Sequence, residues 1–163
     1  MNISESHIDT KLIEIFEIKD FFTISNVTNH KRIDLSNDNN SIDLNTLVLK
    51  AITILNEHFD KNIWIRITLW DKTENAELDN MVLQSIKSFL QFKKVEENSL
   101  ILYYFIEHFE AITVQNLVQS SIYFDRGLQP SINMTCFYFN FDIPVLINIY
   151  DDRGMDIVMP NNL

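Results

Sequence analysis

The clearest pattern along the chain is a helical spacing of apolar residues after Asp43. Apolar side chains recur there at intervals of three and four, the spacing that places them on one face of an α-helix. They are Leu44, Leu47, Val48, Ala51, Ile52, Leu55 and Phe59. Asp43 is a suitable N-cap, because its side chain can accept a hydrogen bond from a free backbone amide of the first turn. The pattern predicts a helix that begins directly after Asp43.

Three other segments show a weaker helical spacing. Residues 8–22 carry apolar side chains at mostly helical intervals, although several fall off the common face. A second segment starts at Asp71 or Thr73 and ends near Lys93-Lys94, whose positive charge suits the C-terminus of a helix. The third carries a stripe made by Val114, Leu117, Val118, Ser121 and Ile122. We predict a helix in each segment.

Strand patterns occupy the middle and the end of the chain. In residues 63–70 the odd positions are aliphatic and the even positions mixed, which is typical of a strand packed mainly on one face. Residues 99–105 form a second β-prone run, and residues 134–141, 145–150 and 155–159 form three more. The last three are separated by short turn-forming segments, which favour antiparallel pairing as a meander. The polar stretch 34–41 is predicted to be a surface loop.

Together these elements predict an α+β fold, in a single domain that spans residues 1–163. We expect a mainly antiparallel sheet of about four to six strands, with about three to four helices packed on one face. A chain of 163 residues with 46% hydrophobic content is long enough to bury such a core. The positions expected in that core are Leu47, Ala51, Leu55, Trp64, Ile65, Leu69, Val82, Ile86 and Phe139.

The charge balance of the chain indicates which class of binding partner to expect. The chain holds 23 acidic residues against 13 Lys and Arg, a formal net charge of −10. Such a field repels nucleic-acid backbones and accelerates encounter with a basic protein, so we expect a basic protein partner and no direct binding of nucleic acid. Cys136 is the single cysteine, and no signal-peptide or membrane-span pattern occurs. A cytoplasmic location without membrane contact is therefore expected.

Both glycines of the chain follow an Asp-Arg pair, and these two turns supply the candidate site. The residues we single out are Asp125, Arg126, Asp151, Asp152, Arg153 and Asp156. One interpretation is two tight turns, in which Asp bonds the backbone and Gly supplies a positive φ. The other is a charged cluster that binds a partner, or a metal ion held by adjacent carboxylates. The turn interpretation is the simpler of the two. If the cluster has a binding role, we expect it to contact a protein partner, and we expect neither metal nor cofactor.

Other reactive residues lack a catalytic arrangement in the sequence. Residues 57–60 and 107–110 repeat a Glu-His-Phe-acid pattern, but each lies near the expected end of an element, where His is commonly a surface residue. Cys136 lies in an aromatic strand pattern typical of a buried, inert thiol. No zinc-binding spacing and no Gly-x-Ser-x-Gly elbow is present. We therefore predict no catalytic residues and no enzymatic activity.

Residues 149–157, with the sequence Ile-Tyr-Asp-Asp-Arg-Gly-Met-Asp-Ile, carry a resemblance to a known family. Together with the earlier order of strand, helix, Asp-Arg-Gly turn and Pro130-Ser131, they resemble a bacterial family designated only as domain of unknown function 3885. The resemblance covers about residues 44–159 and implies no activity. More loosely, the chain is similar to the small acidic immunity proteins encoded beside contact-dependent or type VI bacterial toxins. Those are cytosolic domains that cover a toxin domain, frequently a basic nuclease.

These observations lead to one functional hypothesis and two alternatives. The hypothesis is an immunity protein that binds a cognate basic toxin domain and blocks its active site or substrate channel. The first alternative is a metal-dependent enzyme that uses the Asp-rich turn. The second is a regulatory module without catalytic activity.

Overall fold

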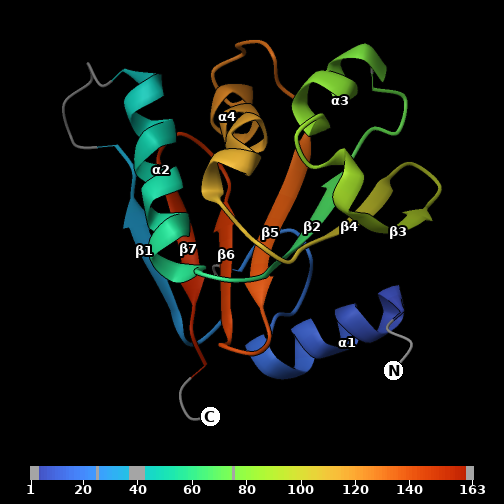
Figure 1. Ribbon diagram of the computed structural model, residues 1–163, viewed down its shortest axis with the longest axis vertical. Helices are drawn as coiled ribbons and strands as arrows, with labels where there is room; N and C mark the ends of the chain where they lie inside the picture. Colours follow the sequence, from blue (N-terminus) through green and yellow to red (C-terminus); the bar gives the residue numbers. More distant parts are fainter. Residues whose placement is uncertain (1–3, 25, 37–42, 75, 161–163) are drawn as a thin grey trace.

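The computed structural model describes residues 4–24, 26–36, 43–74 and 76–160, which form one antiparallel β-sheet with helices on both of its faces (Figure 1). The strands are β1 (His30–Asp34), β2 (Ile63–Leu69), β3 (Leu90–Val95), β4 (Leu100–Ile106), β5 (Met134–Asn140), β6 (Val145–Ile149) and β7 (Gly154–Val158). The helices are α1 (Glu5–Phe16), α2 (Leu44–His58), α3 (Ala76–Leu83) and α4 (Gln115–Phe124), with short 3-10 turns η1 (Lys87–Phe89) and η2 (Ala111–Val114). The α+β class expected from the sequence is confirmed.

The strands lie in the order β1-β7-β6-β5-β2-β4-β3, and every neighbouring pair is antiparallel. β5, β6 and β7 form the predicted meander, with Tyr138 opposite Ile147 and Ile147 opposite Ile157. β2 lies between β5 and β4 at the centre of the other half, where Ile65 is opposite both Tyr138 and Tyr104. The sheet has seven strands, one more than the upper end of the expected range.

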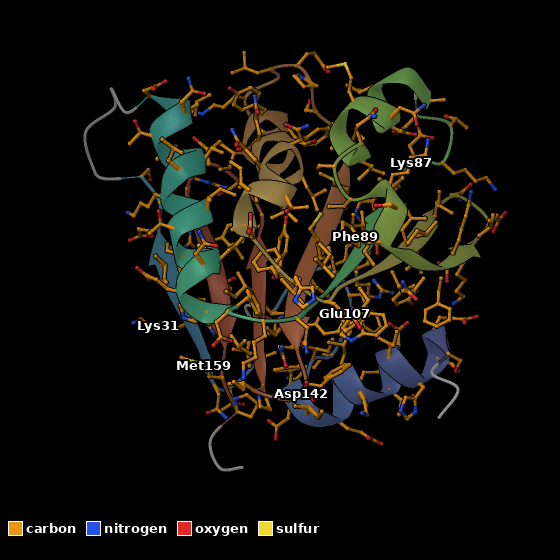
Figure 2. The ribbon with its side chains drawn as sticks, viewed as in Figure 1. Lys31, Lys87, Phe89, Glu107, Asp142 and Met159 are labelled. Carbon is orange, nitrogen blue, oxygen red and sulfur yellow. The ribbon has the colours of Figure 1, made fainter. Side chains whose placement is uncertain are left out.

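One face of the sheet is covered by α2, α3 and α4, whose side chains fill the space above the strands (Figure 2). α2 follows the predicted pattern closely: Asp43 caps it by accepting a hydrogen bond from the backbone N–H of Asn45. Its apolar stripe belongs to the same apolar cluster as the odd positions of β2, of which Ile65 and Ile67 are fully buried. Every residue predicted in the core is buried except Trp64, which is half-buried.

The opposite face is covered by α1 and the segment that follows it. Ile8, Leu12 and Phe16 of α1 pack with Phe137 and Phe139 of β5 in a second apolar cluster. The sequence pattern predicted helices on one face only, whereas the structure has helices on both faces. The physical reason is that the central strands are apolar on both faces, so the second face also requires a cover to exclude water.

Three expected elements differ from the structure. The helix expected within residues 8–22 is α1, which already ends at Phe16. Lys93 and Lys94 lie in strand β3, whereas the preceding helix ends at Leu83, because residues 90–95 pair with β4 along the edge of the sheet. The segment expected to be a loop from Asp34 starts at the end of edge strand β1, and residues 37–42 lie outside the described part of the chain. Among the described helices, none combines the length and the apolar character needed to span a lipid bilayer.

Candidate functional site

The two Asp-Arg-Gly turns meet at one end of the sheet. The first turn follows the last residue of α4, and the second connects β6 to β7, so both lie at the upper end of the sheet in Figure 1. Arg126 of the first turn donates a hydrogen bond from Nε to Oδ2 of Asp152 in the second, at 2.6 Å. We call the group made by Asp125, Arg126, Asp151, Asp152 and Arg153 the Asp-Arg corner.

The side chain of Asp151 organises the second turn by accepting hydrogen bonds from the backbone of that turn. Its Oδ1 accepts hydrogen bonds from the backbone N–H groups of Arg153, at 2.8 Å, and Gly154, at 3.2 Å. Its Oδ2 accepts a further bond from Nε of Arg153, at 2.8 Å. This bond and the attraction of the Asp151 carboxylate raise the pKa of the Arg153 guanidinium. Arg153 therefore stays charged and held against its own turn.

Burial divides the corner into inner and outer groups. The carboxylates of Asp151 and Asp152 are only 7% and 3% exposed, whereas the side chains of Arg126 and Arg153 are 58% and 66% exposed. The buried carboxylates thus hold the guanidinium groups in place. The surface that the corner presents to solvent consists mainly of Arg126, Arg153 and the exposed Asp125. The sequence predicts one charged cluster here and gives no signal that two of its aspartates are buried.

The two glycines have different structural roles. Gly127 has a φ of +65°, the left-handed conformation that the turn interpretation requires. Gly154 begins β7, where a Cβ atom would lie 2.9 Å from the hydroxyl of Tyr150 and 3.0 Å from the backbone oxygen of Ile33. Glycine at position 154 therefore permits the close approach of β1, rather than a positive φ.

Asp156, the sixth residue singled out, lies outside the corner. It is on β7 opposite Arg32 of β1, and it is 2% exposed. Its Oδ1 has no hydrogen-bond partner in the described part of the chain, and Nε2 of His30 lies 3.9 Å away. Burial raises the pKa of Asp156, while the nearby His30 and Arg32 partly offset that effect. His30 and Arg32 were not predicted from the sequence, because β1 itself was not.

The corner also has the spacing of a cation site. One carboxylate oxygen each from Asp125, Asp151 and Asp152 lies within 4.8 Å of the others. Such oxygens are the ligands that Mg²⁺ and Ca²⁺ prefer. Two of these carboxylates, however, already bind guanidinium groups, which supply the positive charge that a metal would otherwise provide.

Two exposed apolar residues adjoin the first turn of the corner in the sequence. Phe124 and Leu128 stand directly before and after the first turn and are 46% and 43% exposed. The corner carries three aspartates and two arginines, a formal charge of −3 + 2 = −1. Exposed apolar groups next to a fixed set of charges are typical of protein-binding surfaces. Phe124 and Leu128 had no sequence signal, since their exposure depends on how α4 packs.

The other candidate residues have structural roles. The repeated Glu-His-Phe segments do meet, but through Phe59 and Phe109, whose rings pack edge to face with centroids 6.0 Å apart. Nδ1 of His58 lies 2.8 Å from the backbone oxygen of Ile54, one turn earlier in α2. Cys136 is fully buried, and this burial raises the pKa of its thiol to about 12. A thiol in that state is a poor nucleophile.

Comparison with known proteins places this architecture in a family. A family model described as a domain of unknown function, DUF3885, matches residues 13–162. The chain belongs to this family. The match reaches further toward the N-terminus than the resemblance read from the sequence, so the DUF3885 domain includes β1 and the end of α1. No curated protein and no solved structure matches the chain.

Proposed function

We propose that this DUF3885 domain is an immunity protein, which binds a cognate basic toxin domain and neutralises it by covering its active site or substrate channel. A nuclease is the toxin class that fits best, since its substrate channel is basic. The observation that carries the proposal is the Asp-Arg corner, in which buried carboxylates fix two exposed guanidinium groups, with exposed Phe124 and Leu128 adjoining its first turn in the sequence.

Local composition supports the corner as a contact surface. Arg and aromatic residues are enriched among the residues that dominate binding energy in protein interfaces. Arg126 and Arg153 are each bonded to a buried aspartate, so less conformational entropy is lost when a partner contacts them. The corner is nearly neutral overall, and we therefore assign it to specific contact rather than to long-range attraction.

The remaining acidity of the chain supports the basic partner. The corner contributes only −1 to the formal charge of −10, so −9 lies elsewhere on the molecule. A field of this sign attracts a basic protein and raises the association rate by roughly 10- to 1,000-fold at low salt. In this proposal the distributed acidic residues guide the encounter, and the corner holds the partner.

The proposal is tested by measuring whether the chain protects a cell from the toxin. The proposal places the toxin gene directly upstream of the gene for this chain, so the protein encoded there is expressed with and without the chain, and growth is measured. We expect growth only when both are present, together with a stable complex of defined stoichiometry from the purified components. Cell death in the presence of the folded chain, with no complex formed, would contradict the proposal.

A metal-dependent activity is the second candidate, because the three carboxylates of the corner lie within 4.8 Å of one another. It predicts stoichiometric binding of Mg²⁺, Mn²⁺ or Ca²⁺ that is lost in the variant Asp125→Asn. The immunity proposal predicts no such binding in a calorimetric titration.

A further inference from the structure

A hollow on the opposite face of the sheet, away from α2, α3 and α4, contains a buried arginine. The hollow has a volume of about 350 Å³, within the usual range of ligand pockets, roughly 300–1,000 Å³. It is lined by Asp9, Asp20, Phe21, Phe22, Arg66, Thr68, Trp70, Lys94, Glu96 and Ile101. None of these residues belongs to the Asp-Arg corner.

Arg66 of β2 is 3% exposed, and its position is fixed from three sides. Nε donates a hydrogen bond to Oδ1 of Asp9, at 2.9 Å, and Nη1 donates one to the hydroxyl of Thr68, at 2.8 Å. The ring of Phe21 lies 3.9 Å from the Cζ atom of Arg66. A guanidinium carries five N–H donors, and these two bonds together with one to Tyr103 use three of them, so two donors remain for a ligand in the hollow.

The carboxylates around the hollow are already engaged. Asp9 accepts bonds from Arg66 and from the hydroxyl of Tyr103, at 2.9 Å each. Oδ1 of Asp20 accepts bonds from the backbone N–H groups of Phe22 and Thr23. Glu96 binds Nζ of Lys94 at 2.9 Å. Lys94 carries three N–H donors, so it too keeps hydrogens available for an anion.

Two stacked aromatic rings also line the hollow. Phe22 and Trp70 are stacked, with ring centroids 4.2 Å apart and an angle of 12° between their planes. The indole Nε1 of Trp70 donates to the hydroxyl of Thr135 at 2.9 Å, which fixes the ring. Phe22 is 64% exposed, although burying so large an apolar side chain would be favourable. The hollow thus combines fixed cationic donors with an exposed, planar, apolar surface.

We propose that this hollow binds a small aromatic monocarboxylate, with its carboxylate on the donors of Arg66 and Lys94 and its ring against Phe22 and Trp70. The planar guanidinium matches the two oxygens of a carboxylate, and a fixed ring adds stacking energy without loss of side-chain freedom. The lining has a formal charge of −3 + 2 = −1, so attraction at long range is absent and the ring must supply much of the affinity. This requirement selects an aromatic acid over a bare anion such as acetate.

The test uses the full chain and 3-phenylpropanoate as the probe, with 3-phenylpropanamide and 2-phenylethylamine as neutral and cationic analogues of similar shape. Binding is followed by calorimetry and by the indole N–H resonance of Trp70, which the variant Trp64→Phe identifies. We expect saturable binding of the acid, at least about tenfold tighter than either analogue, and a shift of the Trp70 resonance. Equal binding of the three compounds, or preference for the amine, would overturn the proposal.

Three variants locate the site. Phe22→Ala should weaken binding of the acid by about two- to tenfold, the range expected for loss of one aromatic pair. Lys94→Gln should weaken the acid but leave the amide unchanged. Phe124→Ala removes an exposed aromatic ring at the Asp-Arg corner, and it serves as the matched control that should bind the probe like the parent chain. Because Phe22 and Lys94 are exposed, both variants should fold; unchanged affinity in both would contradict the proposal.

Discussion

Arg126 and Asp152 join two turns that are 26 positions apart in the chain, through a hydrogen bond of 2.6 Å from Nε to Oδ2. Asp152 is buried while more than half of the Arg126 side chain is exposed. The contact therefore ties the end of α4 to the β6–β7 connection and at the same time presents a fixed guanidinium to solvent. A partner that binds there meets a surface that is already ordered, which reduces the entropic cost of association.

Removing this contact should destabilise the fold. The variant Arg126→Ala leaves the buried carboxylate of Asp152 without its partner, and an unsatisfied buried polar group costs about 1–3 kcal/mol. We expect the free energy of unfolding in urea to fall by about that amount. Lys31→Ala, at an exposed position on β1, is the control and should change it by less than about 0.5 kcal/mol. Equal effects of the two substitutions would mean that the ion pair does not hold the turns together.

The two glycines should respond differently to alanine. At Gly127 the added methyl group meets no atom within 4 Å, and the cost is the positive φ alone, about 1–2 kcal/mol. At Gly154 the methyl group meets a backbone oxygen of β1 at 3.0 Å, which cannot move without disturbing the β1–β7 pairing. We expect Gly154→Ala to lower the urea midpoint more than Gly127→Ala does. The reverse order would show that β1 is not held as closely as the structure indicates.

Asp156 should make stability depend on pH in a direction opposite to most surface acids. Its pKa is raised in the folded protein above the usual value of 3.8, so the folded state binds this proton more tightly than the unfolded state. The resulting stabilisation is complete below about pH 3.8 and is lost as the pH rises through the raised pKa.

The variant Asp156→Asn isolates this effect, because asparagine has no proton to release. We expect the stability of Asp156→Asn relative to the parent to increase between pH 3.5 and pH 7, as followed by urea unfolding across that range. A constant difference at every pH would mean that the carboxyl is not penalised by its burial, and a decrease would mean that His30 and Arg32 hold it ionised.

Cys136 should be unreactive in the folded protein. The thiol is fully buried between the sheet and the helices, and its pKa is raised to about 12 by that burial. A thiolate-specific reagent such as dithiobis(nitrobenzoate) should therefore react only through opening of the structure, slower than in urea by a factor on the order of a hundred or more. Reaction at similar rates in both conditions would show that the strand β5 is accessible.

The elements that sequence reasoning identified best are those in which one periodicity dominates. α2 and β2 carry a strict apolar spacing, and the structure places both where the pattern predicted, including the cap at Asp43. β3 was misread because its apolar residues fit a helix as well as an edge strand, and only its pairing with β4 decides between them. β1 is short and polar, so its strand conformation comes from pairing with β7 rather than from local preference.

The candidate site was predictable in part. The repeated Asp-Arg-Gly turns identified the residues of the corner, but the sequence could not show that Arg126 pairs with Asp152 across two elements, or that Asp156 faces β1. Both facts depend on the order of strands in the sheet. The hollow around Arg66 left no sequence signal, because its lining comes from α1, β2, β3, β4 and connecting segments that only the fold brings together.

The most direct test of the proposed function is the affinity of the purified chain for its cognate toxin domain, compared between the variants Phe124→Ala and Phe22→Ala. Both remove an exposed aromatic ring, but only Phe124 borders the Asp-Arg corner. We predict at least about tenfold weaker binding for Phe124→Ala, unchanged binding for Phe22→Ala, and an association rate that falls with rising salt for all three proteins. Equal affinity of both variants and the parent, with an association rate independent of salt, would contradict the account.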